Sequence, residues 1–129
     1  MNAARRADEG LIVFAHGSRL AEANAAVEAI ARESAKRAGF PLWKAAFLEL
    51  AQPDLRTAAR ELGQAGARRV VVMPYFLVMG IHLSQDFPRL IAEASEASPG
   101  VELIATPALD GHPGLIEIVA ERAQGAVAK

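Results

Sequence analysis

Short apolar runs alternate with longer amphipathic segments along almost the whole sequence, and this alternation constrains the fold more than any other feature. The apolar runs fall at about residues 10–15, 42–48, 70–74 and 101–105. Apolar side chains recur at helical spacing in the segments at about residues 21–38, 53–66, 84–97 and 113–124. This strand–helix alternation predicts an α/β domain with a four-stranded, mainly parallel sheet and helices on both faces.

Length and composition fit one domain of this kind. The chain has 129 residues, and we expect a single domain over residues 10–125, with a flexible leader at 1–9 and a tail at 126–129. Fourteen basic and fifteen acidic residues leave no large basic face, so nucleic acid is not an expected partner. The lack of cysteine excludes disulfides and fits the cytoplasm. The leader does not resemble a secretory signal, and no apolar run reaches the ~18 residues of a membrane span.

Three residues that can bind metals or transfer protons stand where apolar runs give way to loops. His16 follows the first strand, Glu49 follows the second, and His82 ends the loop after the third. Because the carboxyl ends of parallel strands share one edge, we expect the three to converge there. Two imidazoles and a carboxylate can hold a divalent metal or move protons. The simpler alternatives are a helix-capping loop at His16 and a surface carboxylate at Glu49, while Asp86 either orients His82 or caps its helix.

The residues around these three suggest a ligand site. Ser18 and Arg19 follow His16 and suit helix capping or the binding of carboxylate groups. Segment 74–82 is apolar although it reads as a loop, which indicates a flat apolar ligand, a partner surface, or a loop tucked under a helix. His112 opens the last helix, either as a structural residue or as part of the site.

Sequence patterns of competing enzyme classes are missing. No G-x-S-x-G motif surrounds Ser18, which argues against a hydrolase nucleophile. No glycine-rich nucleotide-binding motif follows a strand. Ala15 precedes His16 where phosphohistidine-type sites use arginine, so that class is also disfavoured.

Three blocks of this sequence resemble one known family. They are His16-Gly17-Ser18-Arg19 with Glu22 and Asn24, then Phe47-Leu48-Glu49-Leu50-Ala51 with Pro53, and lastly Pro74, Phe76, Leu77, Gly80, His82, Asp86 and Pro88. Their order and spacing, over about residues 11–114, resemble the CbiX family of small sirohydrochlorin chelatases. The resemblance implies ATP-independent insertion of a divalent metal (Co²⁺, Fe²⁺ or Ni²⁺, as substrate) into a sirohydrochlorin-type tetrapyrrole. Two protons are released, no organic cofactor is needed, and the product serves cobalamin or siroheme synthesis.

The resemblance also implies roles for residues and a partner. His16 and His82 match the metal-site histidines of the family and Glu49 matches its acidic residue, so these three are the expected catalytic and metal-binding set. The expected substrate-binding residues are Ser18, Arg19, Tyr75, Phe76, Leu77, Gly80 and Ser84. Larger members hold two α/β halves, so this chelatase-like half-domain is expected to form a homodimer. A non-catalytic metal or tetrapyrrole carrier and a plain interaction module are the alternatives.

Overall fold

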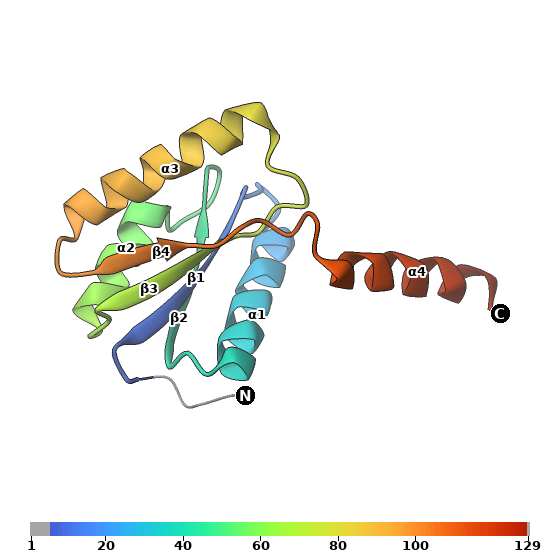
Figure 1. Cartoon of the computed structure of the whole chain (residues 1–129), viewed down its shortest axis with the longest axis horizontal. Helices are drawn as coiled ribbons and strands as arrows, with labels where there is room; N and C mark the ends of the chain where they lie inside the picture. Colours follow the sequence, from blue (N-terminus) through green and yellow to red (C-terminus); the bar gives the residue numbers. More distant parts are fainter. Residues whose placement is uncertain (1–5, 129) are drawn as a thin grey trace.

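The computed structural model describes residues 6–128 and contains a four-stranded sheet in which every pairing is parallel. Strands and helices alternate along the chain, as Figure 1 shows, and the strand order in the sheet is β2-β1-β3-β4. The elements are β1 (Glu9–Ala15), α1 (Ala21–Ala38), β2 (Leu42–Phe47), α2 (Leu55–Gln64), β3 (Arg69–Pro74), α3 (Gly80–Ala97), β4 (Glu102–Ala105) and α4 (Pro113–Val127). The predicted fold class is therefore confirmed.

The structure describes part of each of the two expected terminal segments. In the expected leader, residues 1–5 lie outside the described part, while Glu9 already belongs to β1. In the expected tail, Ala126 and Val127 complete α4, and Lys129 lies outside the described residues. No helix within residues 6–128 is long and apolar enough to cross a membrane.

One face of the sheet is covered by α2 and α3. Ile12, Phe14, Val70 and Val72 point to this side and are almost completely buried. The ring of Phe14 stacks on that of Phe87 from α3, with 5.7 Å between the ring centroids. Burial of these large side chains contributes roughly 1.5–3 kcal/mol each and fixes the two helices on this face.

The opposite face is covered by α1 over β1 and β2 only. The fully buried Ala31 and Ala35 of α1 let the helix approach Leu11 and Val13 of β1 closely. Next to it, the β3 residues Val71 and Met73 and the β4 residue Ile104 are only partly buried. This half of the face therefore has room for another helix.

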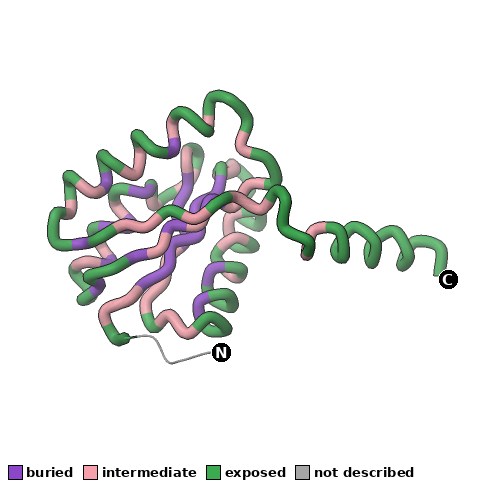
Figure 2. The backbone as a smooth tube through the Cα atoms, in the orientation of Figure 1, coloured by how far each residue is buried: buried purple, intermediate pink, exposed green. Residues whose placement is uncertain are grey.

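The fourth predicted helix forms but does not fill that space. Figure 1 shows α4 projecting away from the sheet, and Figure 2 shows it exposed beyond its first turn. No residue of α4 is buried in the described chain. The expectation of helices on both faces holds for α1, α2 and α3, whereas α4 stands apart.

Two helices begin at positions different from those predicted. Helix α3 starts at Gly80 rather than near residue 84, so His82 lies in its first turn and Pro88 in its interior. The sequence predicts a loop over residues 74–82, whereas in the structure Met79 packs against the core and leads into the helix. Helix α2 begins after Asp54, whose side chain accepts a hydrogen bond from the Thr57 amide at 2.8 Å, and not at Pro53.

Candidate active site

The loops that leave the carboxyl ends of β1, β2 and β3 form one edge of the sheet, which we call the carboxyl edge. His16 directly follows β1, and Glu49 stands two residues after the end of β2. In the β1–β2 register, Ala15 is opposite Phe47. The pairing continues past the strands, because the Leu48 amide donates to the Ala15 carbonyl at 2.8 Å and the Glu49 amide to the His16 carbonyl at 3.0 Å. This extended ladder holds His16 and Glu49 side by side.

The two side chains are in direct contact at an exposed position. Nε2 of His16 lies 2.9 Å from Oε2 of Glu49, and the side chains are 57% and 56% exposed. A neutral imidazole and a carboxylate are both ligands for divalent first-row metals, and both can accept protons. The pair is open to a ligand that approaches from outside the sheet.

Gly17 allows the backbone to turn between these residues. Its φ of +95° is one that residues with a side chain rarely adopt, and a Cβ here would overlap the Glu49 carbonyl oxygen. The loops after β1 and β2 therefore touch at a point where only glycine fits.

Asn24 fixes the loop that follows His16. Its Oδ1 accepts the Ser18 amide at 3.0 Å, and its Nδ2 donates to the Ser18 carbonyl at 2.7 Å. The Ser18 hydroxyl accepts the Leu20 amide at 3.0 Å, but Leu20 itself is the N-cap residue of α1 and the helix has no side-chain cap, so Ser18 does not cap it. Arg19 is exposed and has no ion-pair partner within residues 6–128. In the sequence, Asn24 stood out only as part of a segment that resembles a known family. Its spacing of six residues from Ser18 does not predict these two hydrogen bonds.

His82 does not join the His16–Glu49 pair. It lies exposed in the first turn of α3, and among residues 6–128 no three histidine, aspartate or glutamate side chains are grouped closely enough to hold a metal ion. Asp86 contacts Arg89 at 3.5 Å, and the start of α3 at Gly80 means that Asp86 does not cap the helix. The expected three-residue metal set therefore stays a prediction, with two of its members in contact.

The apolar segment after β3 divides into buried and exposed parts. Tyr75 and Phe76 are half-buried and pack against the two faces of the core; the Phe76 ring meets Phe14 edge to face at 6.1 Å. The Ser84 hydroxyl donates to the Gly80 carbonyl at 2.6 Å. Large exposed apolar side chains nevertheless remain in all three loops and helix starts of the carboxyl edge, and we call them the apolar rim: Leu20, Leu50, Leu77, Val78 and Ile81.

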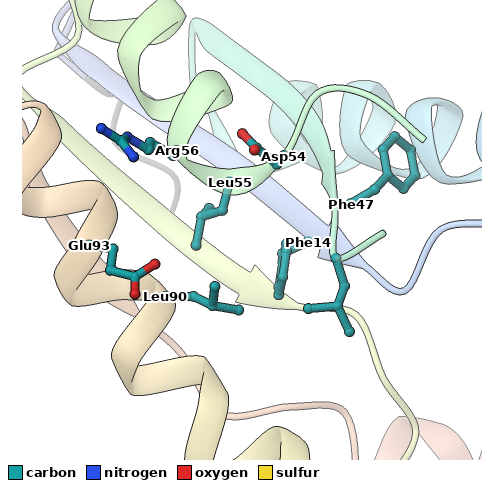
Figure 3. A pocket seen from close by; sticks show the side chains of 8 residues that line it. Phe14, Phe47, Asp54, Leu55, Arg56, Leu90 and Glu93 are labelled. Carbon is teal, nitrogen blue, oxygen red and sulfur yellow. The ribbon is translucent and has the colours of Figure 1, made fainter. Parts of the chain in front are cut away.

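A small cleft opens beside this edge, between α2 and α3. Figure 3 shows Leu90 and Glu93 of α3 facing Leu55 and Arg56 of α2, with Phe14 at the bottom. The cleft encloses about 210 Å³, below the roughly 300–1,000 Å³ of typical small-molecule sites. This cleft is therefore too small for a large flat ligand.

His112 takes the structural role that the sequence suggested as one alternative. Its Nδ1 accepts the Gly114 amide at 2.9 Å and caps the start of α4. This places the third histidine at the base of the projecting helix.

The fold and the edge define a class: a half-size parallel α/β domain with a histidine–carboxylate pair beside an exposed apolar rim. The CbiX family model matches residues 10–126. The chain belongs to the CbiX family.

Individual relatives agree with this assignment. The chain is 36% identical over 116 residues to the chloroplastic sirohydrochlorin ferrochelatase of Arabidopsis thaliana, covering 90% of this chain and 52% of that protein. It is 29% identical over 118 residues to the sirohydrochlorin cobaltochelatase of Sulfolobus acidocaldarius, covering 92% of both. The crystal structure of a putative cobalamin biosynthesis CbiX protein from Marinobacter aquaeolei superposes with a TM-score of 0.78 at 26% identity, covering 93% of this chain and 98% of the other. The chain thus spans about half the length of the plant relative and nearly all of the other two.

Proposed function

We propose that this protein is a sirohydrochlorin chelatase, which inserts Co²⁺ or Fe²⁺ into the tetrapyrrole without an organic cofactor. The observation that carries the proposal is the exposed His16–Glu49 contact beside the apolar rim, in a chain of the CbiX family. Relatives bear the names sirohydrochlorin cobaltochelatase and sirohydrochlorin ferrochelatase, which supports cobalamin or siroheme synthesis as the setting. Ni²⁺ suits the same ligands chemically.

The chemistry requires both a metal ligand and a proton acceptor. Two pyrrole N–H groups lose their protons as their nitrogens bind the metal. Nε2 of His16 lies 2.9 Å from the Glu49 carboxylate. If His16 binds the incoming metal through Nε2, Glu49 would stand beside it and would either bind the metal as well or accept a pyrrole proton.

His82 is the second imidazole of the proposed metal set. It follows β3, the strand next to β1, and so belongs to the same carboxyl edge as His16. Because His82 is exposed at the start of α3, its imidazole is accessible to a metal bound at the carboxyl edge. The neighbouring Leu77, Val78 and Ile81 of the apolar rim would pack on the macrocycle face.

Ser18, Arg19 and Ser84 are the proposed partners of the peripheral carboxylates of the substrate. Arg19 is the best suited of them, because its exposed guanidinium can bind a carboxylate through two hydrogen bonds. The proposal includes a homodimer, since the plant relative is about twice as long as the aligned part of this chain. We also propose that the protein is located in the cytoplasm, which the lack of cysteine supports.

An anaerobic absorbance time course with sirohydrochlorin and Co²⁺ or Fe²⁺ tests the proposal, with non-enzymatic insertion subtracted. We expect the wild type to accelerate insertion. His16→Ala and His82→Ala should return the rate to the blank, and Glu49→Gln should lower it by roughly 10²-fold or more. Glu96→Gln, an exposed carboxylate at the far end of α3, is the matched control and should keep the full rate. Circular dichroism establishes that each variant is folded.

The same assay separates the alternative of a carrier. A carrier would change the absorbance of the bound tetrapyrrole or bind the metal, yet leave the insertion rate at the blank. Full activity in both histidine variants would contradict the assigned metal site. No binding and no acceleration with any of the metals would reject the chelatase proposal altogether.

A further inference from the structure

Asn24 binds the backbone of Ser18 at two points, although it stands inside a helix. Its Oδ1 accepts the Ser18 amide at 3.0 Å, and its Nδ2 donates to the Ser18 carbonyl at 2.7 Å. Asn24 is the fourth residue of α1, and its own amide continues the helix by donating to the Leu20 carbonyl at 3.4 Å. Asparagine is a poorer helix former than alanine. The Asn24 side chain therefore serves the loop rather than the helix that carries it.

The first of these hydrogen bonds holds the peptide group that lies beside the His16 ring. The carbonyl of Gly17 and the N–H of Ser18 belong to the same planar peptide group. On one side of this group, the N–H donates to Oδ1 of Asn24 at 3.0 Å. On the other side, the carbonyl oxygen lies 3.2 Å from Nδ1 of His16. Asn24 thus sets the orientation of the carbonyl group that faces the imidazole.

The backbone before this peptide group is held in place by a different partner. The Glu49 amide donates to the His16 carbonyl at 3.0 Å, which ties the start of the loop to the β2 side. Gly17 follows, with a φ of +95°. Because glycine has the greatest backbone freedom of all residues, the peptide group after it needs a partner of its own to keep one orientation. Asn24 is that partner, and it fixes the end of the loop as Glu49 fixes its start.

The orientation of the Gly17 carbonyl matters for the way in which His16 binds a metal. Nε2 of His16 points to the exposed Glu49 carboxylate, so it is the ring nitrogen that faces the proposed metal position. A neutral imidazole that binds a metal through Nε2 carries its single proton on Nδ1. Metal-binding histidines almost always donate this other N–H to a carboxylate, a backbone carbonyl or water. The Gly17 carbonyl, 3.2 Å from Nδ1, is the acceptor that the loop provides.

We propose that Asn24 is a positioning residue for His16, and that it acts through the Gly17–Ser18 peptide group. By holding the Ser18 N–H, it keeps the Gly17 carbonyl where the Nδ1 proton needs an acceptor, and so favours the metal-bound state of the imidazole. The inference deepens the proposed function and rests on it in taking His16 as a metal ligand. Metal binding and metal insertion are measured separately, so the failure of one proposal can be told from the failure of the other.

The first test is the binding of Co²⁺ to the full-length protein without tetrapyrrole, by isothermal titration calorimetry. Asn24→Ala should raise the Co²⁺ dissociation constant by about 10–100-fold, while circular dichroism shows that the variant is folded. Asn24→Asp keeps an oxygen for the Ser18 amide and should restore most of the affinity. Asn24→Ala/Ala25→Asp is the matched control, because it adds the same charge at an exposed neighbouring position without the hydrogen bond, and should bind as weakly as Asn24→Ala. An unchanged dissociation constant in Asn24→Ala, equal losses in Asn24→Ala and Asn24→Asp, or a rescue by the control would overturn the proposal.

The second test observes the His16 ring directly, by NMR of its nitrogens in the protein saturated with diamagnetic Zn²⁺. We expect the metal on Nε2 and a proton on Nδ1 that exchanges slowly with water in the wild type. In Asn24→Ala this proton should exchange faster, which a role of Asn24 in stability alone would not cause. Coordination through Nδ1, or equal exchange in the two proteins, would contradict the proposal. A wild type that passes both tests but does not accelerate insertion would reject the chelatase and leave the positioning role of Asn24 in place.

Discussion

The contact between His16 and Glu49 is made by backbone geometry more than by the two side chains. Their carbonyl and amide groups extend the β1–β2 ladder beyond the strands, with the Glu49 amide on the His16 carbonyl at 3.0 Å. Gly17 then turns the chain without a side chain that would push the two loops apart. The site pair therefore depends on a residue that takes no part in its chemistry.

Gly17→Ala is expected to destabilise the protein and to displace Glu49. The added Cβ would meet the Glu49 carbonyl oxygen, and the φ of +95° is strained for alanine. Together these effects should lower the free energy of unfolding by about 1–3 kcal/mol. Urea denaturation measures the loss, and the insertion assay should show a lower rate even where the variant is fully folded.

Gly66→Ala is the control for this experiment. Gly66 also has a positive φ, of +110°, but a Cβ there would have no atom within 4 Å. Its loss of stability reports backbone strain alone, and the insertion rate should not change. Equal losses of stability and of rate in the two variants would contradict the role assigned to the Gly17–Glu49 contact.

At the scale of the elements, Asp54 anchors the start of α2, next to the loop that carries Glu49. The hydrogen bond from the Thr57 backbone amide lowers the pKa of the Asp54 carboxyl below its ordinary value of 3.8. The folded state thus binds this proton less readily than the unfolded chain. The contribution of the carboxylate to stability is complete above pH 3.8 and disappears as the pH falls through the lowered pKa of the folded state.

Asp54→Ala should therefore cost about 1 kcal/mol of unfolding free energy at pH 7, and less below pH 3.8. Asp54→Asn keeps a capping oxygen, so it should retain most of the stability at pH 7 without the titration. Urea denaturation at a series of pH values measures both differences. A gap between wild type and Asp54→Ala that stays constant down to acid pH would show that the charge of the cap does not matter.

The strands could be predicted closely from the sequence, but two helix starts could not. Val70 and Val72 belong to a continuous apolar run, which predicts a strand, and both are fully buried under α2 and α3, although the other face of β3 is only partly covered. The start of α3 was missed because Gly80 and the apolar Ile81 read as loop residues, although Gly80 opens the helix. Sequence periodicity detects the middle of an element, whereas its first turn depends on local contacts.

The candidate active site, too, could be predicted only in part from the sequence. The proximity of His16 and Glu49 could be predicted, because two parallel neighbouring strands bring their carboxyl ends together. The position of His82 could not, since its side chain depends on where α3 begins and how that helix sits on the core. The two hydrogen bonds between Asn24 and the Ser18 backbone could not be predicted either, because they depend on the conformation of the loop, which the sequence does not reveal.

At the scale of the whole molecule, the sequence predicts that α4 is a helix but does not indicate what it packs against. Periodicity reports an apolar stripe such as that around Ile116, and any apolar surface of the right length satisfies it. The structure leaves an apolar hollow of about 260 Å³ on the α1 face of the sheet, lined among others by Leu11, Val13 and Met73. If the surface belongs to a second copy, stability must depend on protein concentration, because unfolding then also separates the chains.

The melting temperature of the wild type is accordingly expected to rise with protein concentration. A hundredfold increase adds about 2.7 kcal/mol per dimer, which corresponds to a shift on the order of 4 °C for a chain of this size. Ile116→Gln/Val119→Gln should melt at a temperature independent of concentration, and Ile118→Gln should follow the wild type. A wild type that melts at one temperature across this range would mean that each chain folds and holds its core alone.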